Sequence, residues 1–269
     1  MRTSLVELWQ YRELLYNLTV RDLKVRYKNS VLGIAWSLLN PILMMLVFTV
    51  VYTVMLGQSN RRDYAAFILC GLLPWNFFSG SIMGGVGSVV NNGYLIKKVY
   101  FPRAVLPISI MLSNLVNFLV ALPVYFVLAW LLGVQFTPYV LFLPVVLLVE
   151  MIFIQGVSLL LAALNVFYRD VQQIMEVLIL AWFFVTPVIW DVNLLPESRT
   201  VLGLDVPVQR LTYILNPMAS IVATYRDLLY HGRSIGWDFF LRTALTALIV
   251  LLIGFFVFNR LKGRFAEEV

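Results

Sequence analysis

Six long apolar stretches constrain the fold of this sequence more than any other feature. They cover roughly residues 36–56, 64–90, 105–132, 139–164, 171–190 and 239–258. Each has at least the ~20 residues that a helix needs to cross the ~30 Å hydrocarbon core of a bilayer. Backbone groups inside lipid must be hydrogen-bonded within their own segment, and the alternation typical of membrane strands is absent, so the stretches predict transmembrane helices.

The composition agrees with this interpretation. Of the 269 residues, 61% are hydrophobic and only 13% are charged, and the mean hydropathy is +0.87. A soluble chain must cover itself with polar surface, and about a quarter of its residues are charged. The surplus apolar surface therefore faces lipid. We expect an all-α integral membrane protein with six transmembrane helices in a single domain, residues 1–269.

The distribution of lysine and arginine predicts the orientation. The N-terminal segment, the second and fourth connections and the tail hold 13 of the 20 basic residues. Cytoplasmic segments collect such residues, so both termini are predicted to be cytoplasmic. The net charge of +6 is then explained by topology and by anionic lipid headgroups, and no nucleic-acid partner is expected.

One further stretch, residues 211–230, is long enough to span the membrane but holds Asn216-Pro217 in its middle. Proline removes a backbone donor and disfavours helix at the residue before it. Counting the stretch as a span would also place the basic tail outside. We therefore expect a re-entrant hairpin of two short helices within an outer loop, residues 191–237. A simple extracellular lid is the alternative.

The N-terminal segment, residues 1–34, is expected to lie at the cytoplasmic interface. Residues 5–18 predict a weakly amphipathic helix lying flat on the inner membrane surface, where Trp9, Tyr11 and Tyr16 suit the headgroup region. An ordinary cytoplasmic cap is the alternative.

Residues for catalysis or metal binding are scarce. The sequence has one histidine, His231, and one cysteine, Cys70, from which neither a metal cluster nor a Ser-His-Asp set can be assembled. The glycines of "GGVGS", residues 84–88, resemble a phosphate loop but no lysine follows, so they indicate close helix packing instead. No catalytic site, metal or cofactor is expected in this chain.

Polar residues within the predicted spans are few. Asn114 and Asn117 share a helix face and are expected to form interhelical hydrogen bonds. Glu150, near the middle of the fourth span, is either a functional carboxylate or a protonated partner of Gln155, and the absence of a cation at this depth favours the second. Glu176 is expected to pair with Arg169 or another basic residue.

Four stretches resemble a known family. They are "RDLKVRYKNSVLGIAWSLLNPI" at 21–42, "IKKVYFPRAVLPIS" at 96–109, "FYRDVQQIMEVL" at 167–178 and "LNPMASIVATYRDLL" at 215–229. In this order, with six spans, they resemble the membrane subunit of type-2 ABC exporters. More narrowly, they are similar to the permeases that export O-antigen, capsular polysaccharide and wall teichoic acid.

The resemblance implies a half-transporter that pairs as a homodimer and binds two copies of a separate ABC ATPase, which holds ATP and Mg²⁺. Its substrate would be a polymer on a polyprenyl diphosphate carrier, moved from the cytoplasmic to the outer face of the bacterial plasma (inner) membrane. The resemblance also implies an N-terminal interface helix, a helix in the second connection that docks on the ATPase, and two re-entrant helices after the fifth span.

Three groups of residues become candidates for these roles. Aromatic faces bind sugar rings weakly, which suits a polymer that must slide through successive sites. The expected channel wall consists of Trp182, Phe183 and Phe184, with Met44, Phe48 and Tyr52 opposite; the alternative is that these side chains face lipid or pack between helices. Arginine and lysine bind phosphate, so the substrate diphosphate is expected at Arg21, Lys24, Arg26 and Lys28, although orientation and anionic lipid also explain these charges.

The second connection, residues 91–103, is the candidate coupling segment. Asn91 or Asn92 is expected to cap a short helix, and Pro102 limits it. The residues expected to engage the ATPase are Tyr94, Leu95, Ile96, Lys97 and Lys98. Tyrosine is a favoured anchor at protein interfaces.

Two other classes of function stay open at this point. A stand-alone secondary transporter or flippase for a lipid or sugar would predict inverted repeats and coupled ionisable residues. An integral transferase would need acidic residues at metal-binding spacing, whereas Asp191, Glu197 and Asp205 are scattered. The sequence does not distinguish a glycan from a teichoic acid.

Overall fold

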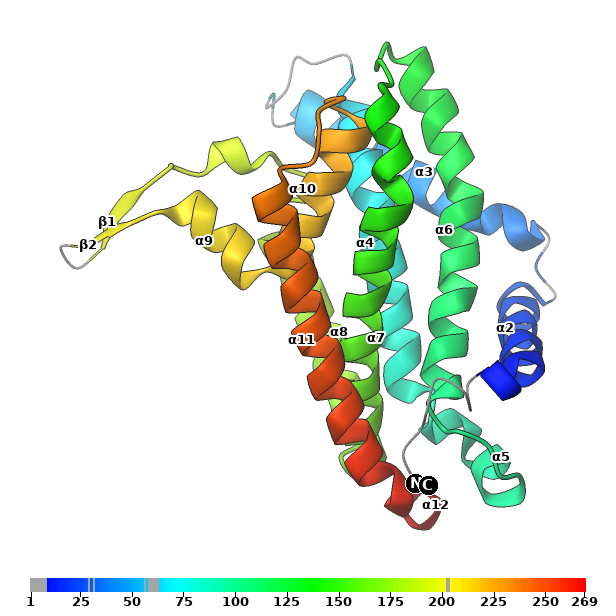
Figure 1. Ribbon diagram of the computed structural model, residues 1–269. Helices are drawn as coiled ribbons and strands as arrows, with labels where there is room; N and C mark the ends of the chain where they lie inside the picture. The colour runs from blue at the N-terminus through cyan, green and yellow to red at the C-terminus, as the bar shows by residue number, and fades with distance from the viewer. Residues whose placement is uncertain (1–8, 29, 31, 56, 58–62, 202–203) are drawn as a thin grey trace.

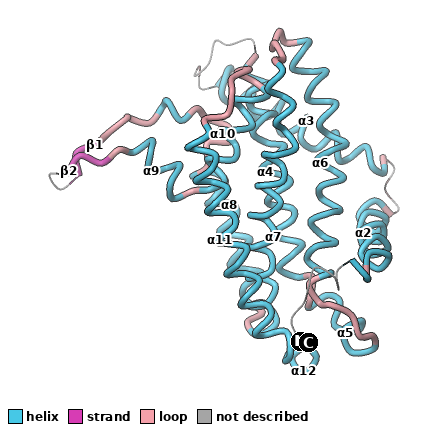
Figure 2. Tube along the Cα trace, in the orientation of Figure 1, coloured by secondary structure: helices cyan, strands magenta, loops and turns pink. Residues whose placement is uncertain are grey.

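The computed structural model describes residues 9–28, 30, 32–55, 57, 63–201 and 204–269 of the chain. Within this part the chain is almost entirely helical (Figure 2). The helices longer than one or two turns are α2 Arg12–Tyr27, α3 Trp36–Thr49, α4 Tyr64–Gly87, α6 Val105–Leu131, α7 Leu143–Phe167, α8 Asp170–Val185, α9 Val208–Leu215, α10 Pro217–Leu229 and α11 Trp237–Leu261. The short elements are η1 Gly33–Ala35, η2 Val50–Met55, η3 Val90–Asn92, α5 Gly93–Lys98, η4 Pro138–Phe142, η5 Val192–Leu194, β1 Arg199–Val201, β2 Leu204–Val206, η6 Lys262–Arg264 and α12 Phe265–Glu268.

Five helical segments among the described residues are long and apolar enough to cross a membrane. They are Trp36–Thr53, Tyr64–Gly87, Val105–Leu131, Pro138–Phe167 and Trp237–Glu268. Helix α4 is the centre of the bundle and packs against α3, α6, α7, α8 and α10. Of its most apolar 18-residue stretch, 78% is buried. The corresponding share in the first segment is only 11%, so the side chains of α3 are largely exposed in a single chain. The all-α membrane fold predicted from the sequence is confirmed.

The fifth predicted span, residues 171–190, differs from the structure. Helix α8 has 16 residues and ends at Val185, which corresponds to about 24 Å at 1.5 Å per residue. Pro187 follows, and the residue before a proline avoids helical angles, so Thr186 is extended. The helix is therefore shorter than a bilayer core, and a buried non-helical turn at residues 186–190 follows it.

The outer loop contains the two short helices that the sequence predicts. Helix α9 ends at Leu215, Asn216 is extended, and α10 begins at Pro217. Figure 1 shows α9 running down from the β1–β2 hairpin and α10 returning toward the upper end of the bundle. The two-helix prediction is confirmed, and neither helix is long enough to span a membrane. The antiparallel β1–β2 hairpin, which the sequence did not predict, precedes them.

The N-terminal helix α2 packs on α6. It is seen nearly end-on in Figure 1, while α6 runs up the picture, so the two helices cross steeply. Residues 5–8 of the predicted interface helix lie outside the described residues. The remainder is helical from Arg12, and the helix continues to Tyr27, well beyond the predicted end.

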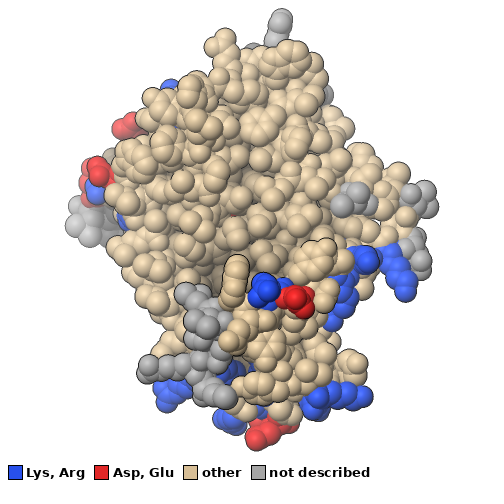
Figure 3. Space-filling model, turned by 45° about the vertical axis from the view of Figure 1, so that its right-hand side comes forward, with Lys and Arg blue, Asp and Glu red and all other residues tan. Residues whose placement is uncertain are grey.

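A second, smaller apolar core lies at the end of the bundle that carries the C-terminus. It joins α2 and α5 to the end of α11 and to α12 through buried side chains that include Leu18, Ile96, Phe101, Phe258 and Phe265. Figure 3 shows that Lys and Arg gather around this lower end, while the centre of the upper part of the same face is uncharged and its few charged side chains lie at the left edge. This distribution agrees with the predicted cytoplasmic placement, which stays a prediction.

Glycines bring several helices into close contact. A Cβ at Gly85 would overlap the Ser158 hydroxyl of α7, so the prediction of close packing at residues 84–88 is confirmed. A similar contact joins α7 to α11, because a Cβ at Gly254 would overlap the backbone carbonyl of Gly156. The α7–α11 pair is therefore packed at a distance that only glycine permits, because the overlap at Gly254 is with backbone atoms.

Candidate transport site

The three consecutive aromatic residues of α8 point in different directions. Successive residues on a helix are separated by about 100°, so three in a row cannot line one wall. Trp182 faces the bundle, with its ring 5.0 Å from Phe78, and Phe183 is buried 5.5 Å from Trp75. Phe184 is 59% exposed. Only Phe184 presents most of its ring at the surface of a single chain.

The predicted partners on the first span lie on its inward face. Met44, Phe48 and Tyr52 are all partly buried against the main core. Phe48 contacts Phe183, with ring centroids 5.7 Å apart, and Tyr52 is 6.2 Å from Tyr64. The first span and α8 therefore do meet through aromatic side chains. Their assignment to a channel wall stays a prediction.

A polar cavity of about 640 Å³ lies between α2, α3, α4 and α6. Two hydrogen bonds close its α2 side, from Arg26 Nη1 to Asn114 Oδ1 and from Tyr27 Oη to Asn117 Oδ1, each 2.8 Å long. These bonds confirm the interhelical role predicted for the two asparagines. The lining residues are Arg26, Tyr27, Trp36, Ser37, Asn40, Pro41, Leu73, Asn76, Phe77, Ser79, Gly80, Asn114, Asn117, Phe118 and Ala121.

Two further asparagines enter this cavity with unused hydrogen-bonding groups. The side-chain amides of Asn40 and Asn76 form no hydrogen bond with any residue that the structure describes. Polar side chains are costly at the depth of membrane spans unless they bind a partner or line a wet cavity. The arrangement therefore offers one cation and several amides to a polar ligand that reaches this end of the first span.

The basic cluster of α2 is divided between two faces of the helix. Arg21, Lys24 and Lys28 follow a spacing of three and four residues and line one shallow groove. Arg26 lies on another face and lines the polar cavity instead. The four side chains predicted to gather the diphosphate do not form one site in a single chain.

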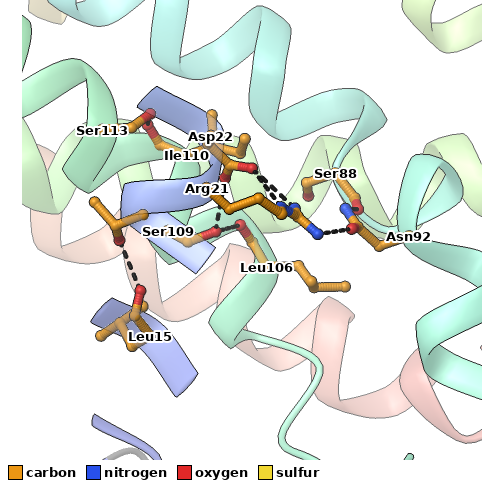
Figure 4. Close-up of polar contacts among 10 residues, drawn as sticks. Leu15, Arg21, Asp22, Ser88, Asn92, Leu106, Ser109, Ile110 and Ser113 are labelled. Atoms are coloured by element: carbon orange, nitrogen blue, oxygen red, sulfur yellow. Dashed lines mark hydrogen bonds and ion pairs between the residues drawn. The ribbon is translucent and has the colours of Figure 1, made fainter. Parts of the chain in front are cut away.

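Arg21 links α2 to the coupling segment (Figure 4). Its guanidinium donates to Asp22 Oδ1 at 2.8 and 3.1 Å and to Asn92 Oδ1 at 3.0 Å. Asp22 Oδ2 also accepts a hydrogen bond of 3.3 Å from Ser109 of α6. The N-terminal helix, the start of α5 and the base of α6 are therefore joined by one polar network.

The coupling segment forms the short helix α5, as predicted, but its cap differs. Asn92 occupies the N-cap position without capping the backbone. Its side-chain amide donates to Ser88 O instead and its oxygen accepts from Arg21, so both groups are already used. Ile96 is buried in the smaller apolar core, while Tyr94 is 72% exposed.

The exposed side of α5 is aromatic and basic. The Lys98 ammonium lies 5.0 Å from the centroid of the Tyr94 ring, and Tyr100 beyond the helix is 72% exposed. Leu95 is partly buried and Lys97 is exposed. Among the five candidate residues, Tyr94, Lys97 and Lys98 therefore present the surface, and Leu95 and Ile96 hold the helix in place.

The buried turn after α8 is held by an arginine that the sequence analysis did not single out as functional. Arg226 of α10 is 6% exposed and donates to the backbone carbonyls of Pro187 and Val188, with a longer contact of 3.4 Å to Trp190 O. Its guanidinium carbon lies 3.6 Å from the centroid of the Phe67 ring. Arg226 forms no ion pair with any residue that the structure describes. Its charge is stabilised by carbonyl dipoles and by an aromatic face instead.

Close packing of α4 makes this contact possible. A Cβ at Gly71 would lie 2.9 Å from Arg226 Nη2 and 2.5 Å from Val188 O. Glycine at this position leaves space for the guanidinium between α4 and the turn. The signal in the sequence was a charged residue in an otherwise apolar stretch, but its partners lie 36 to 39 positions away.

Asn216 ties the start of α10 to the end of α8. Its Oδ1 accepts from Trp182 Nε1 at 2.8 Å and from the Ala219 backbone at 3.3 Å, which caps α10. Its Nδ2 donates to Thr186 Oγ1 at 2.9 Å. The residue that breaks the re-entrant stretch therefore also fixes Trp182, one of the predicted channel residues.

Two predicted carboxylate pairings are wrong. Glu150 is fully buried and accepts a hydrogen bond of 2.7 Å from Tyr225 Oη, while the polar atoms of Gln155 find no partner among the described residues. Residues five apart on a helix are about 140° apart, which rules out the predicted bond. Glu176 is exposed without a salt bridge to a described residue, and Arg169 donates to Glu268 O instead.

Comparison with known proteins settles the family. The profile of the ABC-2 type transporter family matches residues 13–230. The chain belongs to this family. The match runs from α2 to the end of α10 and so includes every candidate site residue named above. As a family member, the chain is a membrane component of an ABC-2 type transporter, in agreement with the resemblance seen in the sequence.

Individual relatives match almost the whole chain. The chain is 36% identical over 263 residues to the O-antigen export system permease protein RfbA of Myxococcus xanthus, covering 98% of both proteins. It is 33% identical over 258 residues to the protein of the same name from Klebsiella pneumoniae, covering 95% of this chain and 94% of that one. The polysialic acid transport protein KpsM of Escherichia coli is 22% identical over 223 residues, with 80% of each chain covered.

Proposed function

We propose that this chain is the permease half of an ATP-driven exporter that moves a polyprenyl-diphosphate-linked polysaccharide from the cytoplasmic to the outer face of the plasma membrane. The observation that carries the proposal is the end-to-end similarity, at 36% and 33% identity, to two O-antigen export permeases. The more distant similarity to a polysialic acid transporter supports the same substrate class. Both favour a polysaccharide over a teichoic acid.

The polar cavity supplies a place for the head of such a substrate. Arg26 would contact the diphosphate, because guanidinium forms charge-assisted hydrogen bonds with phosphate oxygens. The unused amides of Asn40 and Asn76 would bind the hydroxyl groups of the first sugar. Arg21, Lys24 and Lys28, on the other face of α2, would attract the anion without sharing this contact.

The homodimer would form along the helices that one chain leaves uncovered. In α8, only Met175 and Phe183 of 16 residues are buried, and α3 buries only Pro41 and Met45. A second copy on these faces would enclose a channel with Phe184 in its wall. The inward-facing Trp182, Phe183, Met44, Phe48 and Tyr52 would then support that wall from behind.

The energy would come from two copies of a separate ABC ATPase that binds ATP and Mg²⁺. The surface of Tyr94, Lys97 and Lys98 is suited to a cleft on such a partner, since exposed aromatic side chains are frequent interface anchors. Arg21 and Asn92 connect this surface to α2, and the smaller apolar core connects it to α11. Movement of the ATPase would therefore reach α2 directly.

Co-purification tests this proposal. The variant Tyr94→Ala, which leaves the packed Leu95 and Ile96 unchanged, should remain folded in the membrane, lose the co-expressed ATPase during purification and stop export. The matched control is Tyr139→Ala, an exposed tyrosine of η4, which lies at the opposite end of the bundle. A wild-type chain that exports polymer in cells without any bound ATPase would instead favour a stand-alone secondary transporter or flippase.

A further inference from the structure

A second cavity, of about 630 Å³, lies at the cytoplasmic end of the bundle. It is formed by the residues before α2, the end of the coupling segment, and the end of α11. Its lining residues are Gln10, Tyr11, Ile96, Lys97, Lys98, Val99, Tyr100, Phe101, Pro102, Arg103, Asn259, Arg260, Lys262 and Gly263. None of the candidate substrate residues lines it.

The charge of this cavity is strongly one-sided. Its lining has five basic residues, and none of the described lining residues is acidic. Lys97, Arg103 and Arg260 form no salt bridge with any residue that the structure describes. Like charges in one cavity repel each other, so a bound anion would stabilise the arrangement.

The environment of Arg103 gives the clearest argument for an anion in this cavity. It is partly buried, with its guanidinium carbon 5.9 Å from the centroid of the Phe265 ring. Burial lowers the pKa of Arg103, and the nearby Tyr100 opposes this shift. An anion beside the guanidinium would offset the cost of its burial.

The position of the cavity indicates the kind of anion. Arg260 lies in the last turn of α11 and Arg103 lies just before α6, so both are at the ends of long apolar helices. The walls also contain apolar side chains, Ile96, Val99 and Phe101. A phosphate with an attached apolar chain fits cations at headgroup level beside an apolar wall.

We propose that this cavity binds the phosphate headgroup of an anionic phospholipid of the inner leaflet. The lipid would neutralise Arg103 and Arg260 and would join the coupling segment to the end of α11. A free phosphate would use the same cations but would leave the apolar wall unused. A partner protein would have to bring its acidic side chains to the ends of the membrane helices, at the level of the lipid headgroups, where a phospholipid already lies.

Lipid titration of the purified full-length chain tests the proposal. Native mass spectrometry in detergent would compare phosphatidylglycerol with phosphatidylcholine of the same acyl chains. The test variant is Arg103→Gln/Arg260→Gln. The control Arg199→Gln/Arg210→Gln removes the same charge from exposed residues of the outer loop. The variant Arg103→Lys/Arg260→Lys restores the charge and shows that any loss is not due to misfolding.

The wild-type chain and the control should retain phosphatidylglycerol in preference to phosphatidylcholine. The glutamine variant should bind phosphatidylglycerol about 30-fold more weakly, as expected for two basic residues near a lipid phosphate, and the lysine variant should recover most of this loss. Equal binding of both lipids by the wild type would overturn the proposal. So would displacement of the lipid by millimolar inorganic phosphate. Unchanged lipid binding by the glutamine variant would overturn it as well, and loss of the ATPase when that variant is co-expressed with it would identify a partner protein as the occupant.

Discussion

The contact between Arg226 and the turn after α8 makes a sharp prediction about stability. Methionine at position 226 would keep much of the side-chain volume but would leave the buried carbonyls of Pro187 and Val188 without their donor. An orphaned buried acceptor costs about 1–3 kcal/mol, so two cost about 2–6 kcal/mol. Removing the charge regains part of the cost of burying it, which places the net loss at about 2–4 kcal/mol.

Equilibrium unfolding of the purified chain in mixed micelles, with increasing denaturing detergent, would measure this loss. Arg226→Met should unfold at a clearly lower detergent fraction than the wild type. Arg226→Lys should fall between them, because a single ammonium cannot reach both carbonyls with the geometry of a guanidinium. The matched control Arg210→Met changes an exposed arginine of α9 and should shift stability by no more than about 0.5 kcal/mol.

The result that would refute this reasoning is simple. If Arg226→Met were as stable as the wild type, the two carbonyls would have other partners and the turn would not depend on α10. If Arg226→Met and Arg210→Met were equally destabilised, the loss would reflect the removal of any arginine rather than this contact.

Three further predictions follow from individual contacts. Arg26→Ala should lower substrate-stimulated ATPase activity of the reconstituted complex by removing the cation of the polar cavity, and unchanged stimulation would count against that site. In a Cys70→Ala background, cysteines replacing Gln209 and His231 should both react with an impermeant thiol reagent from outside, whereas labelling from opposite sides would make 211–230 a true span. Gly254→Val should destabilise the chain by about 3 kcal/mol or more, measured by the same unfolding assay, because its side chain would overlap the backbone of α7; wild-type stability would mean that the two helices separate easily.

The sequence predicted the features that depend on long patterns. Apolar runs of span length placed α4, α6, α7 and α11 within a few residues of their observed ends, and the run at 36–56 corresponds to α3 together with η2. The break in the helix at Asn216 was also predictable, since Pro217 disfavours helical angles at the residue before it. The end of α8 was missed by five residues, although Pro187 gave the same kind of signal, because the apolar run continues through it.

Contacts between distant segments were harder to predict. The sequence shows Arg226 as a charged residue in an apolar stretch. The neighbouring residues do not indicate that its guanidinium donates hydrogen bonds to backbone carbonyls of another segment. Trp182 and Phe183 were predicted to line the channel because the sequence shows that they are aromatic. The direction in which they point depends on how α8 packs against α4. Glu150 was correctly assigned a structural hydrogen bond, and only its partner, Tyr225, required the fold.

The most direct test of the proposed function is polymer movement in a defined membrane. Proteoliposomes would contain the permease and its ATPase, oriented with the ATPase outside, and polyprenyl-linked polysaccharide added to the outer leaflet. On addition of ATP and Mg²⁺, the polysaccharide should become protected from an added glycosidase, and it should stay accessible with a non-hydrolysable nucleotide or without the ATPase. Protection that develops equally without ATP or without the ATPase would contradict the account.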